Sequence, residues 1–248
     1  MSKDRKTLIK FIGIVMLGAF IGAVMGYTGS RRNESLLEMF DGLQAVLVRI
    51  SPVIMAFASV LVIKSVIELS KCKKLVDKAM STQEENDFDE AAKTLETTLS
   101  STAYGLMAGY VGFGIAMSGV FKNYDVSSII IFMLQTVVFV IISFVTTVVQ
   151  SKGVKLDKIM APEKKGNPLD MKFHKEYYDS CDEAEKDLIG RASYKSYVAT
   201  TTAIVIALVI CIVMSAFTPI GAIPSMLLVF VWFVQTYTFL EESKKNRR

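Results

Sequence analysis

The stretch of sequence that decides the fold is residues 180–210, which read SCDEAEKDLIGRASYKSYVATTTAIVIALVI. Its first half is rich in charged side chains, whereas its second half carries none from Val198 to Ile210. Residues 87–117 change character in the same way and read DFDEAAKTLETTLSSTAYGLMAGYVGFGIAM. Each stretch predicts a helix that begins in water and continues without a break into an apolar environment.

The rest of the chain is built from similar apolar blocks. Of its 248 residues, 52% are hydrophobic, and its mean hydropathy is +0.41. A helix needs about 20 apolar residues to cross the hydrocarbon layer of a membrane. Six blocks meet this requirement and predict an all-α integral membrane protein: one membrane domain with six transmembrane helices in three hairpins. The predicted spans are residues 8–27, 43–67, 102–121, 129–149, 198–217 and 220–240, with connections 68–101 and 150–197 on one side.

The positive charges predict the orientation of these spans. Six helices place most of the 28 Lys and Arg residues on the side that holds both termini. Cytoplasmic loops carry an excess of Lys and Arg, so we expect a multi-pass protein of the cell membrane with both termini in the cytoplasm. The basic inner face is then expected to contact lipid headgroups. Acidic residues are interleaved there, so direct nucleic-acid binding is not expected. The four cations on the opposite side are Arg31, Arg32, Arg49 and Lys122.

The charged half of the opening stretch belongs to an internal repeat. Asp182–Leu188 matches Asp89–Leu95 at five of seven positions. Asp157–Met160 resembles Asp77–Met80, and residues 161–173 then read as an insertion in the second connection. These similarities favour duplication of a packing unit over a chemical site written twice.

The repeated acidic residues fit a structural role at helix N-termini. Ser180 with Glu183, and Asp87 with Glu90, have the spacing of a capping box, in which each side chain binds a free backbone amide of the first turn. A catalytic carboxylate and a partner contact are the alternatives.

The predicted helices extend beyond the membrane. Residues 88–121 contain no proline, so a continuous helix of about 50 Å is expected there. We expect the third and fifth helices to reach into the cytoplasm and to form a stalk with residues 71–80 and 152–160.

Inside the predicted spans, small residues outnumber functional ones. Glycines four residues apart indicate close helix packing, with a ligand cradle as the alternative. No Asp, Glu or Lys lies at mid-membrane, which argues against an ion-coupled pump. Arg49, about two turns into its span, is expected to snorkel to the interface. The spaced glycines are Gly18, Gly22, Gly26, Gly105 and Gly109, and the polar residues are Gln135, Gln235, Thr146, Thr147 and Thr200–Thr202.

Motifs of catalysis and of metal or cofactor binding are missing from the sequence. There is no G-x-S-x-G, H-E-x-x-H or P-loop, and the run GYVGFG lies inside an apolar helix. His174 is the only histidine, and the three cysteines show no C-x-x-C spacing, so neither a zinc nor a haem site is expected. None of these cysteines lies on the outer side, so no structural disulfide is expected. The protein is therefore predicted not to be an enzyme and to carry no cofactor.

Residues 166–186 read GNPLDMKFHKEYYDSCDEAEK. This run, with the apolar blocks around it, resembles a family of small six-helix membrane proteins of Gram-positive bacteria, known only as a domain of unknown function. The resemblance implies six spans and a cell-membrane location but no activity. Its members often lie beside small helix-turn-helix regulators, which suggests regulation. The residues that carry it are Gly166, Asn167, Pro168, Lys172, Phe173, Tyr177, Tyr178 and Ser180–Glu185.

Two functions follow as hypotheses. The first is a non-enzymatic regulatory or interaction subunit that docks a cytoplasmic or membrane partner through its charged inner layer. The second is a small transporter or permease component, with a path between the three hairpins and with Gln135 and Gln235 facing that path. An intramembrane enzyme is a minor third, because the sequence offers no nucleophile and base in a recognisable pair.

Overall fold

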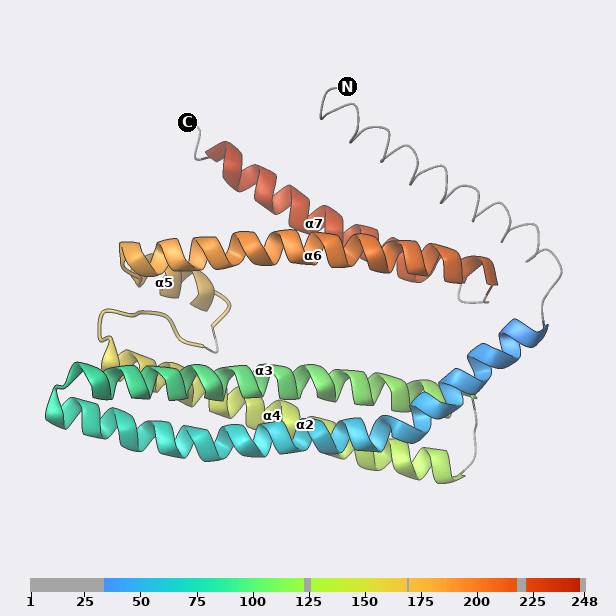
Figure 1. The fold of residues 1–248 in the computed structure, drawn as a ribbon, viewed down its shortest axis with the longest axis horizontal. Helices are drawn as coiled ribbons and strands as arrows, with labels where there is room; N and C mark the ends of the chain where they lie inside the picture. Colours follow the sequence, from blue (N-terminus) through green and yellow to red (C-terminus); the bar gives the residue numbers. More distant parts are fainter. Residues whose placement is uncertain (1–33, 123–125, 169, 218–221, 246–248) are drawn as a thin grey trace, which may run out of the picture. The chain divides into compact units, whose positions relative to one another are not determined.

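A computed structural model describes residues 34–122, 126–168, 170–217 and 222–245. These residues form six helices and no strand, so the described part of the chain is all-α, as predicted (Figure 1). The predicted first span, residues 8–27, lies outside the described residues, as do Gly18, Gly22, Gly26, Arg31 and Arg32. The helices are α2 (Glu34–Thr82), α3 (Glu85–Lys122), α4 (Val126–Met160), α5 (Phe173–Ser180), α6 (Glu183–Phe217) and α7 (Ile223–Lys245).

Five of these helices are long and apolar enough to cross a membrane. They overlap the five predicted spans that the structure describes. The continuous helix predicted from residue 88 is confirmed, since α3 runs unbroken through its glycines. The candidate spanning helices are Asp41–Thr82, Glu85–Val120, Val126–Met160, Glu183–Ser215 and Ile223–Glu242.

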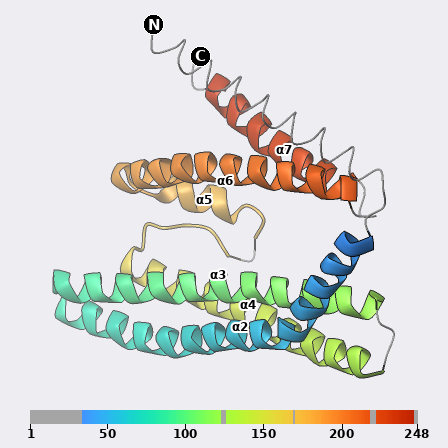
Figure 2. The same ribbon diagram turned by 45° about the vertical axis from the view of Figure 1, so that its right-hand side comes forward.

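The chain divides into two compact units, which are described separately. The larger unit is Gly42–Asp187, and it contains most of α2 together with α3, α4 and α5. Figures 1 and 2 both show α2, α3 and α4 side by side along their length. The other unit includes α7 and most of α6.

The bundle of α2, α3 and α4 is held together by a heptad pattern of buried residues. Buried positions in α2 are separated alternately by four and three residues, apart from one interval of seven between Ser65 and Cys72. This spacing keeps one face of a helix turned toward its neighbours in a left-handed bundle. The pattern extends from Ser51 to Ala79, about 42 Å at 1.5 Å per residue. The buried α2 residues are Ser51, Met55, Ala58, Val62, Ser65, Cys72, Val76 and Ala79. We call this face, with its counterparts on α3 and α4, the seam.

One register relates α2 to α4 along the whole seam. Gln135 donates a hydrogen bond to Ser51, 84 residues earlier in the chain. The same separation relates Ala58 to Ile142 in one buried cluster and Cys72 to Leu156 in another. The two helices therefore stay in step over at least three heptads. The buried α4 residues are Gln135, Ile142, Thr146, Val149, Gly153 and Leu156.

Small residues let α3 approach its neighbours closely. A Cβ atom on Gly105 would lie 2.8 Å from Cγ2 of Val62 and 3.3 Å from the Ala58 carbonyl oxygen, so no side chain fits there. At Gly109 a Cβ would meet Phe139 and Ile142 of α4 at ordinary contact distance. The packing interpretation of this glycine pair is therefore confirmed, since both face neighbouring helices.

The seam continues past the predicted spans as an ordinary apolar core. Cys72 and Val76 of α2, Ala91 and Leu95 of α3 and Leu156 of α4 form one buried cluster there. The predicted stalk is thus present for α2, α3 and α4. The predicted contribution of the fifth helix to it is not tested, because most of α6 belongs to the other unit.

In the second unit, α6 and α7 meet along one line of contacts. The Gln235 amide donates a hydrogen bond to the Tyr197 carbonyl oxygen at 3.3 Å, and the rings of Tyr197 and Phe239 stack with centroids 4.6 Å apart. Most of the remaining apolar side chains of both helices are exposed within the described residues, as lipid-facing positions would be.

The seam predicts opposite outcomes for two glycines of α3. Gly105→Ala should lower the free energy of unfolding by about 1–3 kcal/mol, because the added methyl group overpacks against Val62 and the Ala58 carbonyl. Gly114→Ala should be neutral or stabilising, because a Cβ at Gly114 has no neighbour within 4 Å and alanine favours helix over glycine. Unfolding of the detergent-solubilised protein in denaturant measures both. Equal effects at the two positions would contradict the seam.

Candidate functional site

The connection between α4 and α6, residues 161–182, is folded against the end of α4 around one buried lysine. The side chain of Lys164 is only 9% exposed, and its ammonium group lies 3.3 Å from Asp157 of α4 and 3.0 Å from Glu185 of α6. The Tyr177 hydroxyl of α5 donates to Asp157 at 2.7 Å, and Lys164 lies over the Tyr177 ring. One cation thereby joins three helices and their connection. We call Asp157, Lys164, Tyr177 and Glu185 the latch.

Electrostatic interactions within the latch keep Lys164 charged and Tyr177 protonated. Burial is the largest influence on Lys164 and by itself lowers the lysine pKa, but the hydrogen bond to Glu185 and the charge of Asp157 outweigh it. The net pKa of Lys164 is therefore raised, and the lysine stays charged. Burial and the hydrogen bond to Asp157 raise the pKa of Tyr177 to about 12. Tyr177 thus remains a hydrogen-bond donor throughout the physiological range.

Gly166 allows the connection to turn back on itself. Its φ is +94°, a conformation that favours glycine, and a Cβ there would lie 3.1 Å from both the ring and the carbonyl oxygen of Phe173. Lys158 of α4 donates to the Gly166 carbonyl oxygen. The Phe173 ring in turn packs against Tyr177. The first glycine and the first aromatic residue of the motif are therefore in contact.

The structure corrects the predicted cap of α6. Ser180 is the last residue of α5 rather than an N-cap: its hydroxyl accepts from the Lys165 amide at 2.9 Å and donates to the Tyr177 carbonyl at 2.7 Å. Asp182 caps α6 instead, since its carboxylate accepts from the Glu185 amide at 2.7 Å. The prediction was wrong by two residues because a short helix, α5, ends where the cap was expected.

The predicted cap of α3 is corrected in a similar way. α3 begins at Glu85, so Asp87 lies within its first turn. The Asp87 carboxylate accepts from Lys78 and from the Thr82 hydroxyl, each at 2.7 Å, and so closes the turn between α2 and α3. Lys78 here and Lys158 in α4 hold equivalent positions in the sequence similarity. Lys78 reaches from the end of α2 to the first turn of α3, and Lys158 reaches from the end of α4 to the connection that follows.

Most other motif residues lie around the latch without entering it. Cys181 is 5% exposed and directs its thiol to the Tyr177 carbonyl oxygen at 3.3 Å. Its pKa is raised by burial, which leaves the thiol protonated and unreactive. Lys186 lies over the Tyr178 ring, and Asp170 accepts from the Lys172 amide. These contacts order the connection.

The polar residues predicted inside the membrane lie in both units: Gln135 and Thr146 belong to the larger one, and Thr200 and Gln235 line one hollow of the other. Gln135 lies in the seam with 5% exposure, and its amide donates to Ser51 at 3.1 Å. Gln235 instead donates to backbone in the other unit. Thr146 is buried in the seam, 1% exposed. Each contact is of the kind that joins two helices in lipid.

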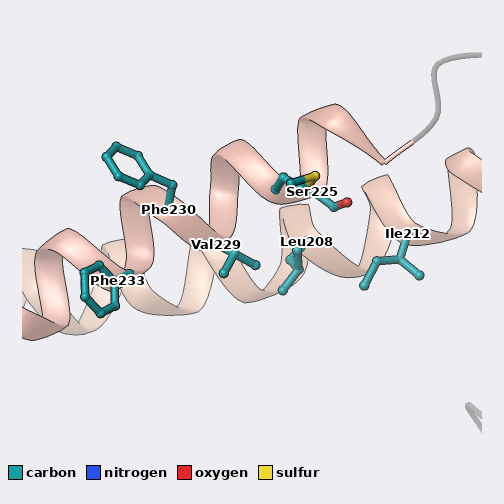
Figure 3. Close-up of a pocket in the computed structure, with 7 residues that line it drawn as sticks. Leu208, Ile212, Ser225, Val229, Phe230 and Phe233 are labelled. Carbon is teal, nitrogen blue, oxygen red and sulfur yellow. The ribbon is translucent and has the colours of Figure 1, made fainter.

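One hollow between α6 and α7 is apolar. It has a volume of about 520 Å³ and no charged residue lines it. Figure 3 shows Leu208 and Ile212 from α6 on one side and Ser225, Val229, Phe230 and Phe233 from α7 on the other. Such a surface suits lipid tails or another helix rather than a reacting group.

The described side chains form no recognisable metal-binding group. In the described ranges, no group of three or more His, Cys, Asp or Glu residues could hold a metal ion. The latch combines two carboxylates with a lysine and a tyrosine, but each of these groups is used to hold another. Its arrangement suits fixing a surface rather than performing a reaction.

The comparisons assign the chain to a family. A family described as "Protein of unknown function (DUF3169)" matches residues 5–242. The chain belongs to this family. The match covers nearly the whole chain, including the residues of the seam and of the latch. Neither a curated protein nor a solved structure matches the chain.

Sequence reasoning missed Lys164, the centre of the latch in this family member. The lysine lies in the segment interpreted as an insertion, one of two adjacent lysines among charged neighbours. Only the fold distinguishes it from Lys165, which is exposed. The one available signal was Asp157, which matches Asp77 in the sequence similarity. It lies near the end of α4, where a basic partner for its carboxylate could be expected.

The two adjacent lysines provide a test of the latch. Lys164→Met should leave Asp157 and Glu185 without their cation and destabilise residues 161–182 by roughly 2 kcal/mol, less than a fully buried pair because Glu185 is partly exposed. Hydrogen exchange of that segment in the full-length protein should speed up accordingly. Lys165→Met, the matched control, should leave exchange unchanged. Equal exchange in both variants would contradict the latch.

The raised pKa of Tyr177 predicts a pH dependence. Tyrosinate absorbance of the wild-type protein minus that of Tyr177→Phe should titrate with a midpoint near pH 12. The same difference in denaturant should titrate near 10. Because the folded protein holds this proton more tightly than the unfolded chain does, the contribution to stability is complete below about pH 10 and is lost as the pH rises through 12. A folded-state midpoint near 10 would show that Tyr177 is not buried against Asp157.

Proposed function

We propose that the protein is a non-enzymatic, multi-pass protein of the cell membrane that acts as a regulatory or interaction subunit. Six spans place both termini in the cytoplasm, together with the latch and the α2–α3 turn. The cytoplasmic layer docks a protein partner, and the apolar helices sit in the lipid bilayer. The excess of Lys and Arg on that side supports this orientation.

The observation that carries the proposal is the way the latch presents α5. Phe173, Tyr177 and Ser180 face inward, and the opposite side of the same segment is open to solvent. Met171 is 101% exposed and Tyr178 is 43% exposed. A rigid surface loop that displays a large apolar side chain and an aromatic ring is typical of a binding surface. We call Met171, Lys172, His174, Lys175 and Tyr178 the α5 face.

The seam gives a second line of support. Within the described part of the bundle, most interior positions are occupied by small and apolar residues whose backbones approach closely. Polar residues there, such as Gln135 and Ser51, bind each other. A membrane region that is packed rather than hollow suits an anchor or a subunit better than a carrier. The alternative is a small transporter or permease component with a path between the three hairpins.

Loss of the α5 face should abolish partner binding. Affinity purification of the full-length protein from solubilised membranes should recover one protein in near-stoichiometric amount. Met171→Ser combined with Tyr178→Ser should lose it, because both exposed contacts are removed while the latch is intact. Tyr194→Ser, which alters an exposed tyrosine of α6 outside the motif, should retain it. The absence of any stoichiometric partner of the wild-type protein would contradict the proposal.

A further inference from the structure

At the end of the bundle farthest from the α2–α3 turn, the seam opens into a hollow. Its volume is about 280 Å³, and α2, α3 and α4 all line it. Val120, Ile131 and Phe132 form apolar walls, whereas Arg49, Ser51 and Ser128 supply polar groups. This mixture distinguishes it from the apolar hollow of Figure 3.

The local sequence of α2 produces this hollow. Pro52 has no amide hydrogen, so the Val48 carbonyl loses its usual helical donor. The Ser51 hydroxyl takes that place and donates to Val48 at 2.8 Å. Opposite, Gly119 brings α3 against Val48, where a Cβ would lie 2.7 Å from a Val48 methyl carbon. The helices therefore touch beside the hollow, and no side chain fills it.

Arg49 in the hollow and Gln135 beside it are not fully paired among the described residues. Arg49 has no ion-pair partner among the side chains that the structure describes, and it lies on a helix whose neighbouring exposed residues are apolar, such as Val46 and Val53. Gln135, one helical turn beyond Ile131, binds Ser51, but its carbonyl oxygen is buried without a hydrogen bond in the described part of the chain. A cation within an apolar segment marks a binding position by default.

We propose that this hollow binds the phosphate group of an amphiphile. Arg49 holds the phosphate through charge-assisted hydrogen bonds, for which a guanidinium is well suited. Ser51 supplies a second polar group, and Val120, Ile131 and Phe132 contact the adjoining carbon chain. A membrane phospholipid and a soluble phosphate ester share this chemistry. The site is independent of the docking function, since it lies at the other end of the bundle.

Native mass spectrometry of the detergent-solubilised full-length protein tests the site. The probes are phosphatidylglycerol, phosphatidylcholine and glycerol phosphate, each at matched concentration. The wild-type protein should retain one phosphatidylglycerol in preference to phosphatidylcholine, whose cationic headgroup competes with Arg49. Arg49→Gln should weaken that binding by about tenfold, the effect of losing one hydrogen bond to a charged group. Lys64→Gln, which removes an exposed cation near the other end of the same predicted span, should change nothing.

Each outcome has a defined meaning. Binding of glycerol phosphate that depends on Arg49 would identify a soluble ester as the source of the phosphate, and binding of phosphatidylglycerol alone would identify the membrane lipid. Equal retention of both lipids by the wild-type protein would overturn the proposal. Equal losses in Arg49→Gln and Lys64→Gln would overturn it as well, because the lipid would then respond only to net charge. Thermal unfolding of each variant without lipid checks that the fold is intact.

Discussion

The heptad contact between α2, α3 and α4 is the constraint on which the rest of the structure depends. It keeps one register between α2 and α4 from Ser51 to Cys72, although the surroundings of the helices change along that distance. Where the outer surface is apolar, the seam combines buried apolar residues, such as Met55, Val62 and Ile142, with small and polar ones, such as Ser51 and Ser65. Close backbone approach and hydrogen bonds hold helices together in lipid. Toward the α2–α3 turn, where the outer surface is charged, the seam becomes leucine-rich, because burial of apolar surface drives association in water. The same heptad packing therefore holds the helices together both where their outer surface is apolar and where it is charged.

The latch depends on this seam for its position. Asp157 is held next to Leu156, a seam residue, so the carboxylate that binds Lys164 and Tyr177 is fixed by the bundle. From there the contacts pass to Glu185 at the start of α6. A buried ion pair is weak evidence for stability but often serves to select one arrangement. Here it selects how the connection lies on α4, and it leaves the α5 face exposed.

The coarse structure could be predicted from the sequence, but the seam could not. Long apolar blocks require helices in a membrane, so all-α architecture and five of the spans could be read directly. The seam could not, because Ser51, Ala58 and Ser65 sit among apolar neighbours on every side and hydropathy does not separate the two faces of such a helix. The latch was hidden for a different reason. Its lysine resembles any solvated lysine until the fold buries it, whereas the glycine and aromatic residues of the motif were singled out correctly without their contacts.

Cysteine cross-linking in isolated membranes tests the shared register most directly. In a background with Cys181 and Cys211 replaced, native Cys72 should form a disulfide with Leu156→Cys upon oxidation, and, with Cys72 also replaced, so should the pair Ser51→Cys and Gln135→Cys, three heptads away. Lys155→Cys, which is exposed on the same helix, should stay free. Disulfides at both ends would establish one continuous seam. Cross-linking of Lys155→Cys as readily as Leu156→Cys, or at only one end of the bundle, would contradict it.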